Sequence, residues 1–325
     1  MNFRHAKTSL LGALVLCFLV SLFANRINSY WLFISYDIGI NIILAVSLNL
    51  INGYTGQFSL GHAGFMAVGA YTAAVITNQF GGLNPFLSGA VFLGALLAGG
   101  LLAAVAGLLV GIPTLRLRGD YLAIVTLGFG EIIRVIFQNM QSVGGARGLS
   151  IAHGWTNFFW AFGFAAVTVY VVTTLVHSTY GRGFIAVRDD EVAASAMGIS
   201  TTRYKVTAFV IGAFFAGIAG GLYAHSKQFI TPGGFNFMES IAIVVMVILG
   251  GMGNTIGVII AAILLTLLPE GLRKIAGVEH IPGFTSEFPF SWVGEARMII
   301  YSLLLIVLML TRPQGLFSFR KLPSK

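Results

Sequence analysis

Few side chains in this sequence have the chemistry to bind or react, and five of them lie in or beside long apolar runs. Gln57, Ser59 and His62 stand at the start of one run, and Glu131 and Arg134 lie three residues apart inside another. Residues three apart share one face of a helix, so Glu131 and Arg134 are expected to form an ion pair. If the runs cross a membrane, polar groups facing lipid are costly, so these side chains should point into a helix bundle or a water-filled path. They are candidates for the lining of a translocation path, and the alternative is that they only hold helices together or anchor a helix end.

Catalysis and metal binding need clustered ionisable groups, and the sequence lacks that pattern. The six histidines are scattered along the chain, and no second ligand stands at helical spacing from His62. The single cysteine, Cys17, excludes an internal disulfide and a cysteine-based metal cluster. No Gly-x-x-x-x-Gly-Lys-Ser/Thr sequence occurs, so the chain is not expected to bind ATP by that device. We expect a protein that is not an enzyme and that holds no metal or cofactor of its own.

The apolar runs are long enough to cross a membrane as helices. Of the 325 residues, 57% are hydrophobic and 9% are charged, whereas an ordinary soluble domain has about 25% charged residues. A helix needs about 20 mostly apolar residues to cross the hydrocarbon core of a bilayer. We expect an all-α polytopic membrane protein, a single transmembrane domain over residues 1–325. Its ten expected segments are 8–25, 30–51, 57–78, 86–110, 119–138, 156–177, 205–225, 238–252, 254–270 and 295–311.

Basic residues set the expected orientation of the chain. Lys and Arg outnumber Asp and Glu by 19 to 11, and they concentrate at both ends and in the loop 178–204. Cytosolic parts of membrane proteins carry such an excess. We therefore expect both termini and the 178–204 loop in the cytosol, the loop 271–294 outside, and the chain in the lipid of a bacterial inner membrane. The net charge of +8 is explained in this way without a nucleic-acid partner.

Two glycine-rich breaks separate neighbouring segments, one near residues 52–56 and one near residues 250–254. Glycine has no side chain, so it allows positive φ angles and lets two backbones approach closely. Each break is either a tight turn or an interruption within a discontinuous helix, and the sequence leaves both open. The glycines assigned to this structural role are Gly53, Gly56, Gly61, Gly64, Gly250, Gly251 and Gly253.

The loop 178–204 contains the signal for a short helix. Its acidic run, 189–191, complements the dipole of a first helical turn, and good helix formers follow. Gly198 is placed to end the helix. We predict a helix of two or three turns over residues 189–198, lying at the cytosolic face between two membrane segments.

This loop resembles the coupling loop of ATP-binding-cassette importer permeases, in which Glu-Ala-Ala is followed a few residues later by Gly. Val192 stands between the glutamate and the alanines here, and no Leu-Pro pair follows within the loop. The resemblance implies that the loop seats in a cleft of an ATPase and couples ATP hydrolysis to transport. The residues to which it assigns this role are Arg188, Asp189, Asp190, Glu191, Ala193, Ala194 and Gly198.

Three further stretches, 52–65, 113–134 and 247–254, resemble the branched-chain amino acid permease family. They follow the family's order, and they are closer to the longer of its two paired permeases. The resemblance implies a ten-helix importer fold in a complex with a second permease subunit, two cytosolic ATPases that bind ATP and Mg, and a periplasmic binding protein. It also implies inward transport of branched-chain or related amino acids by alternating access, driven by the separate ATPase.

Two other functions stay open at this point. A permease for urea or a short amide in the same family would carry the same motifs, since no residue here distinguishes these substrates. A secondary transporter that works without ATP would need a chain of ionisable residues through the membrane midplane. Asp37, Glu131 and Arg134 are the residues that approach this pattern, and three are too few for such a chain. The sequence therefore favours the ATP-driven importer.

Overall fold

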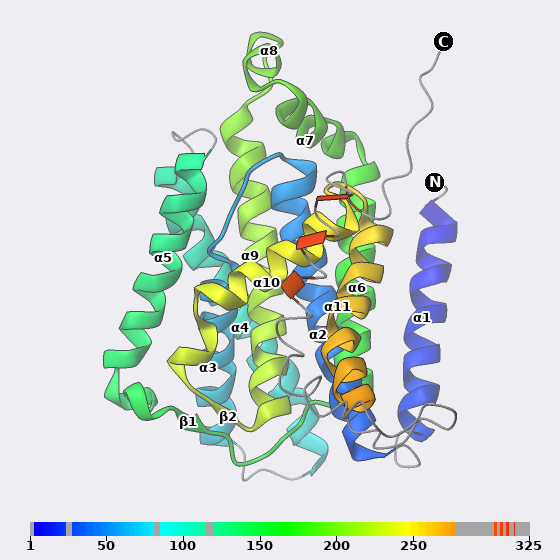
Figure 1. The fold of residues 1–325 in the computed structure, drawn as a ribbon, viewed down its shortest axis with the longest axis vertical. Coiled ribbons are helices and arrows are strands. Elements are labelled where there is room, and N and C mark those ends of the chain that lie inside the picture. The colour runs from blue at the N-terminus through cyan, green and yellow to red at the C-terminus, as the bar shows by residue number, and fades with distance from the viewer. Residues whose placement is uncertain are drawn as a thin grey trace, which may run out of the picture.

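Helices that run mostly along the longest dimension of the protein form its bundle (Figure 1). The computed structural model describes residues 3–23, 28–80, 85–114 and 120–276, and a few positions between 302 and 315. The helices in these ranges are α1 (Phe3–Phe23), α2 (Ser29–Asn49), α3 (His62–Phe80), α4 (Pro85–Thr114), α5 (Asp120–Asn139), α6 (Phe158–His177), α7 (Thr179–Asp189), α8 (Glu191–Ala196), α9 (Thr201–Lys227), α10 (Phe237–Gly250) and α11 (Thr255–Ala276). Between them lie the π-helical turn η2 (Leu50–Tyr54), the 3₁₀ turns η3 (Gln141–Val143), η4 (Gly145–Arg147) and η5 (Pro232–Phe235), and the antiparallel two-residue strands β1 (Leu149–Ser150) and β2 (Phe229–Ile230).

Nine of these helices lie on predicted segments. α1 to α6 and α9 to α11 each coincide with one of the first nine apolar segments. Helices form there because a bilayer offers the backbone no hydrogen bonds, and a helix satisfies its own N–H and C=O groups. Among the described helices, six are long and apolar enough to cross a membrane: α2, α4, α5, α6, α9 and α11. The tenth segment, 295–311, falls mostly outside the described residues, so the count of ten crossings stays a prediction.

Helix α11 continues past the point where an external loop was predicted to begin. α11 runs to Ala276, whereas the loop was placed at 271–294. The helix continues because Glu270 and Arg273 lie three residues apart on it, with Arg273 Nη1 3.8 Å from Glu270 Oε2, an arrangement that supports a helix. The rest of the predicted loop lies outside the described residues.

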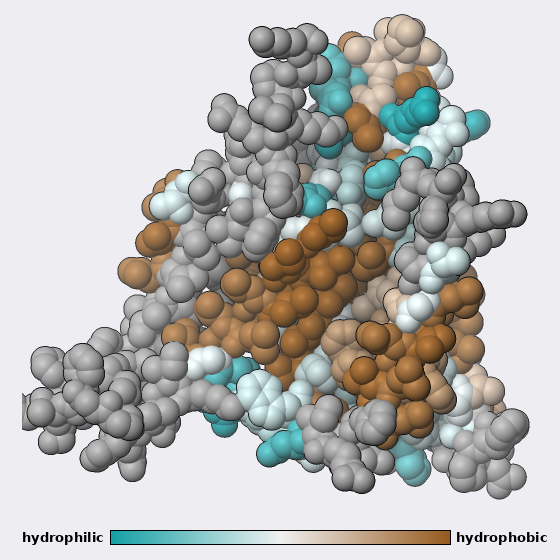
Figure 2. Space-filling view, turned by 90° about the vertical axis from the view of Figure 1, so that its right-hand side faces the viewer, coloured by the Kyte–Doolittle hydropathy of each residue, from teal (hydrophilic) through white to brown (hydrophobic). Residues whose placement is uncertain are grey.

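The two ends of the bundle differ. α7 and α8 stand at one end, together with the start of α1, and the β1–β2 pair lies at the other (Figure 1). Apolar side chains cover the middle height of the face seen in Figure 2, and hydrophilic ones gather toward both ends. This banding is the arrangement that a membrane with water on both sides requires.

The centre of the bundle is the close contact of α3, α4 and α9. A Cβ atom on Gly69 of α3 would overlap the backbone of Gly217 on α9, and one on Gly99 of α4 would lie 2.8 Å from the Gly69 carbonyl oxygen. Small residues permit such approach between membrane helices, where dispersion contacts replace the hydrophobic effect. The fully buried Phe209 of α9 lies against α4, with its Cβ 3.7 Å from a Cβ atom placed on Gly111. Tyr71 of α3 is also fully buried, and its ring stacks on Phe137 of α5, with ring centres 4.3 Å apart.

Candidate functional site

The first glycine-rich break begins in a π-helical turn and continues as a non-helical connection. α2 passes into the π-helical turn η2, and α3 begins only at His62, so residues 55–61 are irregular. The predicted segment 57–78 therefore began too early. Hydrogen bonds to Asn52 replace those of a helix, since its Oδ1 accepts the Ser59 N–H at 3.2 Å. Gly56 takes a φ of +67°, which a helix does not allow.

Burial alternates along this connection. Gln57 and Ser59 are buried, with 4% and 0% exposure, whereas their neighbours Gly56 and Phe58 are exposed. Alternation of this kind is that of an extended chain, whose successive side chains point to opposite sides. It directs Gln57 and Ser59 to the interior of the bundle, as predicted for these two side chains.

The buried polar side chains of this region divide into bonded and unbonded atoms. His62 Nε2 lies 2.9 Å from Ser47 Oγ, so this contact joins α3 to α2. Both amide atoms of Gln57, the hydroxyl of Ser59 and Nδ1 of His62 have no hydrogen-bond partner among the described residues. A hydrogen bond between helices thus explains in part why the polar ring of His62 is buried. No such bond explains the burial of the Gln57 amide or of the Ser59 hydroxyl.

The second glycine-rich break is a tight turn. α10 ends at Gly250, and Gly251 and Gly253 take φ values of 94° and 81° before α11 begins. A Cβ atom on Gly250 would lie 2.4 to 2.7 Å from the backbone of 257–258, so α10 and α11 turn closely on each other. Of the two alternatives for this break, the turn is the one found.

The two breaks touch each other. The Gly253 N–H donates a hydrogen bond of 2.9 Å to Oδ1 of Asn49, at the end of α2. A Cβ atom on Gly53 would overlap both Asn49 and the Gly253 backbone. Two motifs about 200 residues apart therefore form one junction, which we call the break junction (Asn49, Gly53, Gly56 and Gly253).

The end of α7 reaches the break junction. A Cβ atom on Gly56 would lie 2.9 Å from Cγ of Arg188, and one on Gly253 would lie 3.4 Å from its Nη1. The same guanidinium donates to Asp189 from Nη2 at 2.8 Å. Arg188, predicted to couple to an ATPase, thus contacts the break junction inside the chain.

The short helix of this loop differs from the prediction at its start. Asp189 ends α7, and Asp190 is the N-cap of α8, with its Oδ1 accepting the N–H groups of Val192 and Ala193 at 2.8 and 3.0 Å. The predicted helix over 189–198 is therefore six residues long and begins at Glu191. An aspartate is more stable as an N-cap than inside the first turn, because its side chain satisfies free N–H groups.

The end of the helix agrees with the prediction. Gly198 takes a φ of +82° and donates its N–H to Ser195, and the Ile199 N–H bonds the carbonyl of Ala194. This is the Schellman arrangement, in which a left-handed glycine closes the helix. The cap holds α8 in one shape although it is short.

α8 exposes apolar side chains at the tip of the molecule. Val192 is 63% exposed and Met197 82% exposed, whereas Ala194 is buried. Figure 1 shows α8 beyond the ends of the long helices. Ala193, Ser195 and Ala196 are also exposed, so the outer face of α8 is mostly apolar. Met197 was not among the residues predicted to couple to an ATPase.

Glu131 and Arg134 form the predicted ion pair, with Arg134 Nε 2.7 Å from Glu131 Oε2. Their side chains are 33% and 27% exposed, on a helix that is mostly unburied. α5 packs on the start of α3, where Gly61 lies against Thr126 and Gly64 against Gly130. Glu131 also lines a small, open hollow, with Leu60, Gly64, Asn236 and Ser240. The packing thus brings Glu131 beside the segment that carries Gln57, Ser59 and His62.

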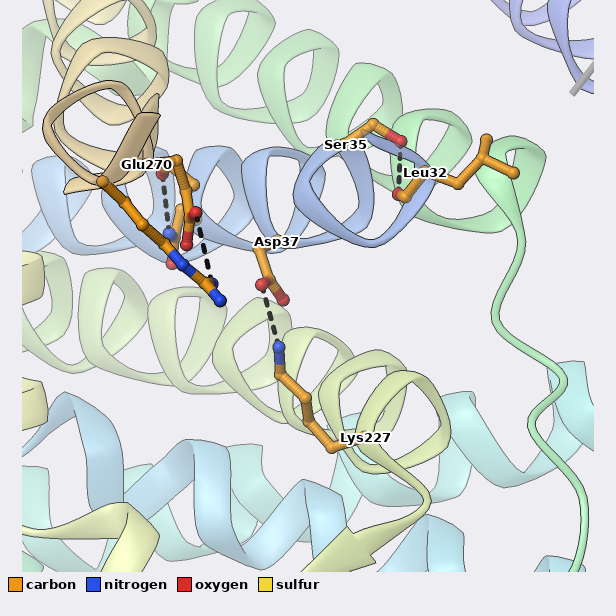
Figure 3. Close-up of polar contacts among 8 residues, drawn as sticks. Leu32, Ser35, Asp37, Lys227 and Glu270 are labelled. Carbon is orange, nitrogen blue, oxygen red and sulfur yellow. Dashed lines mark hydrogen bonds and ion pairs between the residues drawn. The ribbon is translucent and has the colours of Figure 1, made fainter. Parts of the chain in front are cut away.

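A second ion pair lies near the end of the bundle that carries β1 and β2. Lys227, at the end of α9, donates to Oδ2 of Asp37 on α2 at 2.8 Å, and Figure 3 shows the two side chains pointing toward each other. The Lys227 ammonium also lies 5.8 Å from the centre of the Tyr223 ring. The sequence left open whether Asp37 has a functional or a structural role. Its ion pair with Lys227 links α2 to α9. In the part of the chain that the structure describes, no three His, Cys, Asp or Glu side chains gather as metal ligands would.

Comparisons with known proteins match nearly the whole chain. The family model for the branched-chain amino acid transport system permease component matches residues 30–309. The high-affinity branched-chain amino acid transport system permease proteins LivM of Salmonella typhimurium and Escherichia coli are each 37% identical over 312 residues, which cover 85% of this chain and 67% of theirs. A probable branched-chain amino acid transport permease protein LivM of Methanocaldococcus jannaschii is 26% identical over 323 residues, covering 86% of this chain and 90% of its own. This protein belongs to the family of branched-chain amino acid transport system permease components.

Proposed function

We propose that this chain is the membrane-spanning permease subunit of an ATP-driven importer for branched-chain amino acids. The observation that carries the proposal is the family match over residues 30–309, which spans the chain from α2 to α11. The chain has no phosphate-binding motif, so the ATPase is a separate polypeptide that binds ATP and Mg.

The contact with that ATPase is α8. Val192 and Met197 are large apolar side chains that water would surround on an isolated chain, and exposed apolar groups at one tip favour a protein partner. Two such ATPases serve the complex, one under this chain and one under the second permease subunit. The residues from Arg188 to Gly198 move with the ATPase as it closes on ATP.

The translocation path runs along α5 and the start of α3. Gln57 and Ser59 supply buried polar atoms without partners, and Glu131 with Arg134 supplies both signs of charge that a zwitterionic amino acid requires. The hollow beside Glu131 is support for this position, because it opens between α3, α5 and α10. The second permease subunit covers this side, since an ion pair on a membrane helix is costly against lipid.

The orientation follows from the basic residues. The loop that carries α7 and α8 contains Arg182, Arg188, Arg203 and Lys205, so it faces the cytosol. The start of α1 lies at the same end of the bundle (Figure 1), which supports a cytosolic N-terminus. With ten crossings the C-terminus is cytosolic as well, and the opposite end meets the periplasmic binding protein outside the bacterial inner membrane.

Uptake by the reconstituted complex tests the proposal. The chain with its second permease, ATPases and binding protein is placed in proteoliposomes, and uptake of labelled leucine is measured with ATP, with ADP, and without the binding protein. Leucine uptake that requires ATP and the binding protein is expected. Uptake that does not depend on ATP would show that the protein is a secondary transporter. Uptake of urea or acetamide in place of leucine would show that the substrate is not a branched-chain amino acid.

A further inference from the structure

One ion pair, between a buried lysine and a partly exposed glutamate, joins α8 to the start of α9. The ammonium of Lys205 lies 2.7 Å from Oε1 of Glu191, and the two side chains are 7% and 27% exposed. Glu191 is the first residue of α8, and Lys205 lies one turn into α9. The pair thus joins the short projecting helix to the helix that runs through the centre of the bundle.

Burial makes this pair more than a surface contact. A lysine ammonium removed from water is costly unless a carboxylate neutralises it, and loss of one partner leaves the other charge uncompensated. The exposed pair of Arg188 and Asp189, with 37% and 61% exposure, carries no such penalty because water screens it. The position of α8 therefore depends on Glu191 remaining against Lys205.

The neighbouring helix α7 is held to the same turn of α9. The ring of Tyr204 lies 4.5 Å from that of Tyr180 and 5.5 Å from that of Phe184, measured between ring centres. A Cβ atom on Gly183 would overlap the Tyr204 ring. Tyr204 and Lys205, adjacent on α9, thus contact α7 and α8 respectively, and the three elements pack together as one unit.

α9 extends from this unit across the bundle to its opposite end. Its 27 residues span about 40 Å, and it packs closely on α3 and α4 through Gly217. At its far end Lys227 pairs with Asp37 of α2 (Figure 3). An ion pair thus stands at each end of one continuous helix, one facing α8 and one facing α2.

We propose that Lys205 is a positioning residue for transport: through Glu191 it passes the displacement of α8 to α9, and so to the membrane helices. The inference rests on the proposed function, because it takes α8 to be the part that the ATPase moves. Coupling between two sites needs an element whose position both sites bias. The unit of α7, α8 and the first turns of α9 is that element.

Charge variants in the complete complex test this role. The variants are Lys205→Met, Glu191→Gln, the two combined, and the exchange of Glu191→Lys with Lys205→Glu. Arg203→Met is the matched control, because Arg203 is an exposed cation two residues away on the same helix. Leucine uptake and ATP hydrolysis are measured in the same proteoliposomes, and co-purification of the ATPase reports assembly.

We expect each single variant to lower the leucine transported per ATP about tenfold while the ATPase still binds. The combined neutral variant has no unpaired buried charge, so it should recover thermal stability and still transport poorly. The charge exchange should restore most of the transport per ATP, and Arg203→Met should leave it unchanged.

A structural role alone would give a different result. If the combined neutral variant regains the wild-type ratio together with stability, the pair only holds α8 in place and the proposal is overturned. A charge exchange no better than the single variants also overturns it. Failure of the proposed function is distinct, because the wild-type complex itself would then show no ATP-dependent uptake of leucine.

Discussion

At the scale of single residues, packing does not explain why polar atoms are buried in the connection between α2 and α3. His62 has a partner in Ser47, at 2.9 Å. Neither amide atom of Gln57 has one among the described residues, although the residue is 4% exposed. An unsatisfied buried group costs about 1–3 kcal/mol. A chain that keeps Gln57 at such a cost is consistent with a role for its amide in transport.

Replacing Gln57 should separate stability from transport. Gln57→Leu removes the unpaired amide and keeps a similar volume, so we expect the purified protein to unfold at the same or a higher temperature. We expect leucine uptake to fall, on the order of tenfold, if the amide contacts the passing substrate with a hydrogen bond worth about 1.5 kcal/mol. Thermal unfolding in detergent and uptake in proteoliposomes measure the two effects.

Ser47→Ala is the control for this prediction. It removes a hydroxyl that is bonded to His62, so it should lower the unfolding temperature, because the His62 ring is left buried with neither nitrogen bonded. Normal leucine uptake by the Gln57→Leu variant would show that Gln57 does not line the translocation path.

At the scale of elements, α8 is a short helix whose shape depends on its two caps. Asp190 closes its start and Gly198 its end. Six residues form too few internal hydrogen bonds to hold a helix alone. The caps and the Glu191–Lys205 pair together therefore keep α8 in a single position. The coupling proposed for Lys205 requires such a fixed position.

The left-handed cap can be tested without changing any contact. Nothing lies within 4 Å of a Cβ atom placed on Gly198, so Gly198→Ala changes only the cost of its φ of +82°, about 1–2 kcal/mol. We expect this variant to hydrolyse ATP with less leucine uptake per ATP. Gly198→Asn should be milder, since asparagine accepts left-handed angles more readily. Wild-type leucine uptake per ATP in both variants would show that the backbone conformation at 198 does not matter for coupling.

At the scale of the whole molecule, α3, α4 and α9 pack more closely than the other helices and form the centre of the bundle. α9 lies against α3 and α4 through backbone contacts at Gly69, Gly99 and Gly217. A membrane protein gains helix association from such close packing because lipid is as apolar as the helix surfaces. The transport role proposed for Lys205 relies on this close packing, because it requires that a displacement at α8 reach the membrane helices through α9.

An added methyl group should therefore act very differently at two glycines. Gly69→Ala places Cβ into the backbone of Gly217, and we expect a loss of about 1–3 kcal/mol of stability from overpacking. Gly94→Ala, on the exposed side of α4 with open space around it, should be neutral or slightly stabilising. Unfolding temperatures of the two variants in the same detergent measure the difference, and equal values would contradict the close contact.

Much of the fold could be predicted from the sequence, because membrane helices form locally. Each helix satisfies its own backbone and needs only a long apolar run, so nine segments were found where the runs indicated them. The Glu131–Arg134 pair and the Gly198 cap were predictable for the same reason, since both depend on residues within one turn. Helix starts were less predictable: α3 begins at His62 because Asn52 bonds the backbone of Ser59, which the apolar run does not reveal.

Contacts between distant segments were decided only by the tertiary structure. The break junction joins Gly53 to Gly253, and neither glycine motif indicates the other. The pairs of Lys205 with Glu191 and of Lys227 with Asp37 depend on where α9 lies between α8 and α2. The sequence by itself determined that the chain crosses a membrane as helices and which family it resembles, because both follow from runs and motifs along the chain. The tertiary structure decided which charges are neutralised and which helix links α8 to the bundle. Both depend on distances between side chains of different helices, and only packing sets those distances.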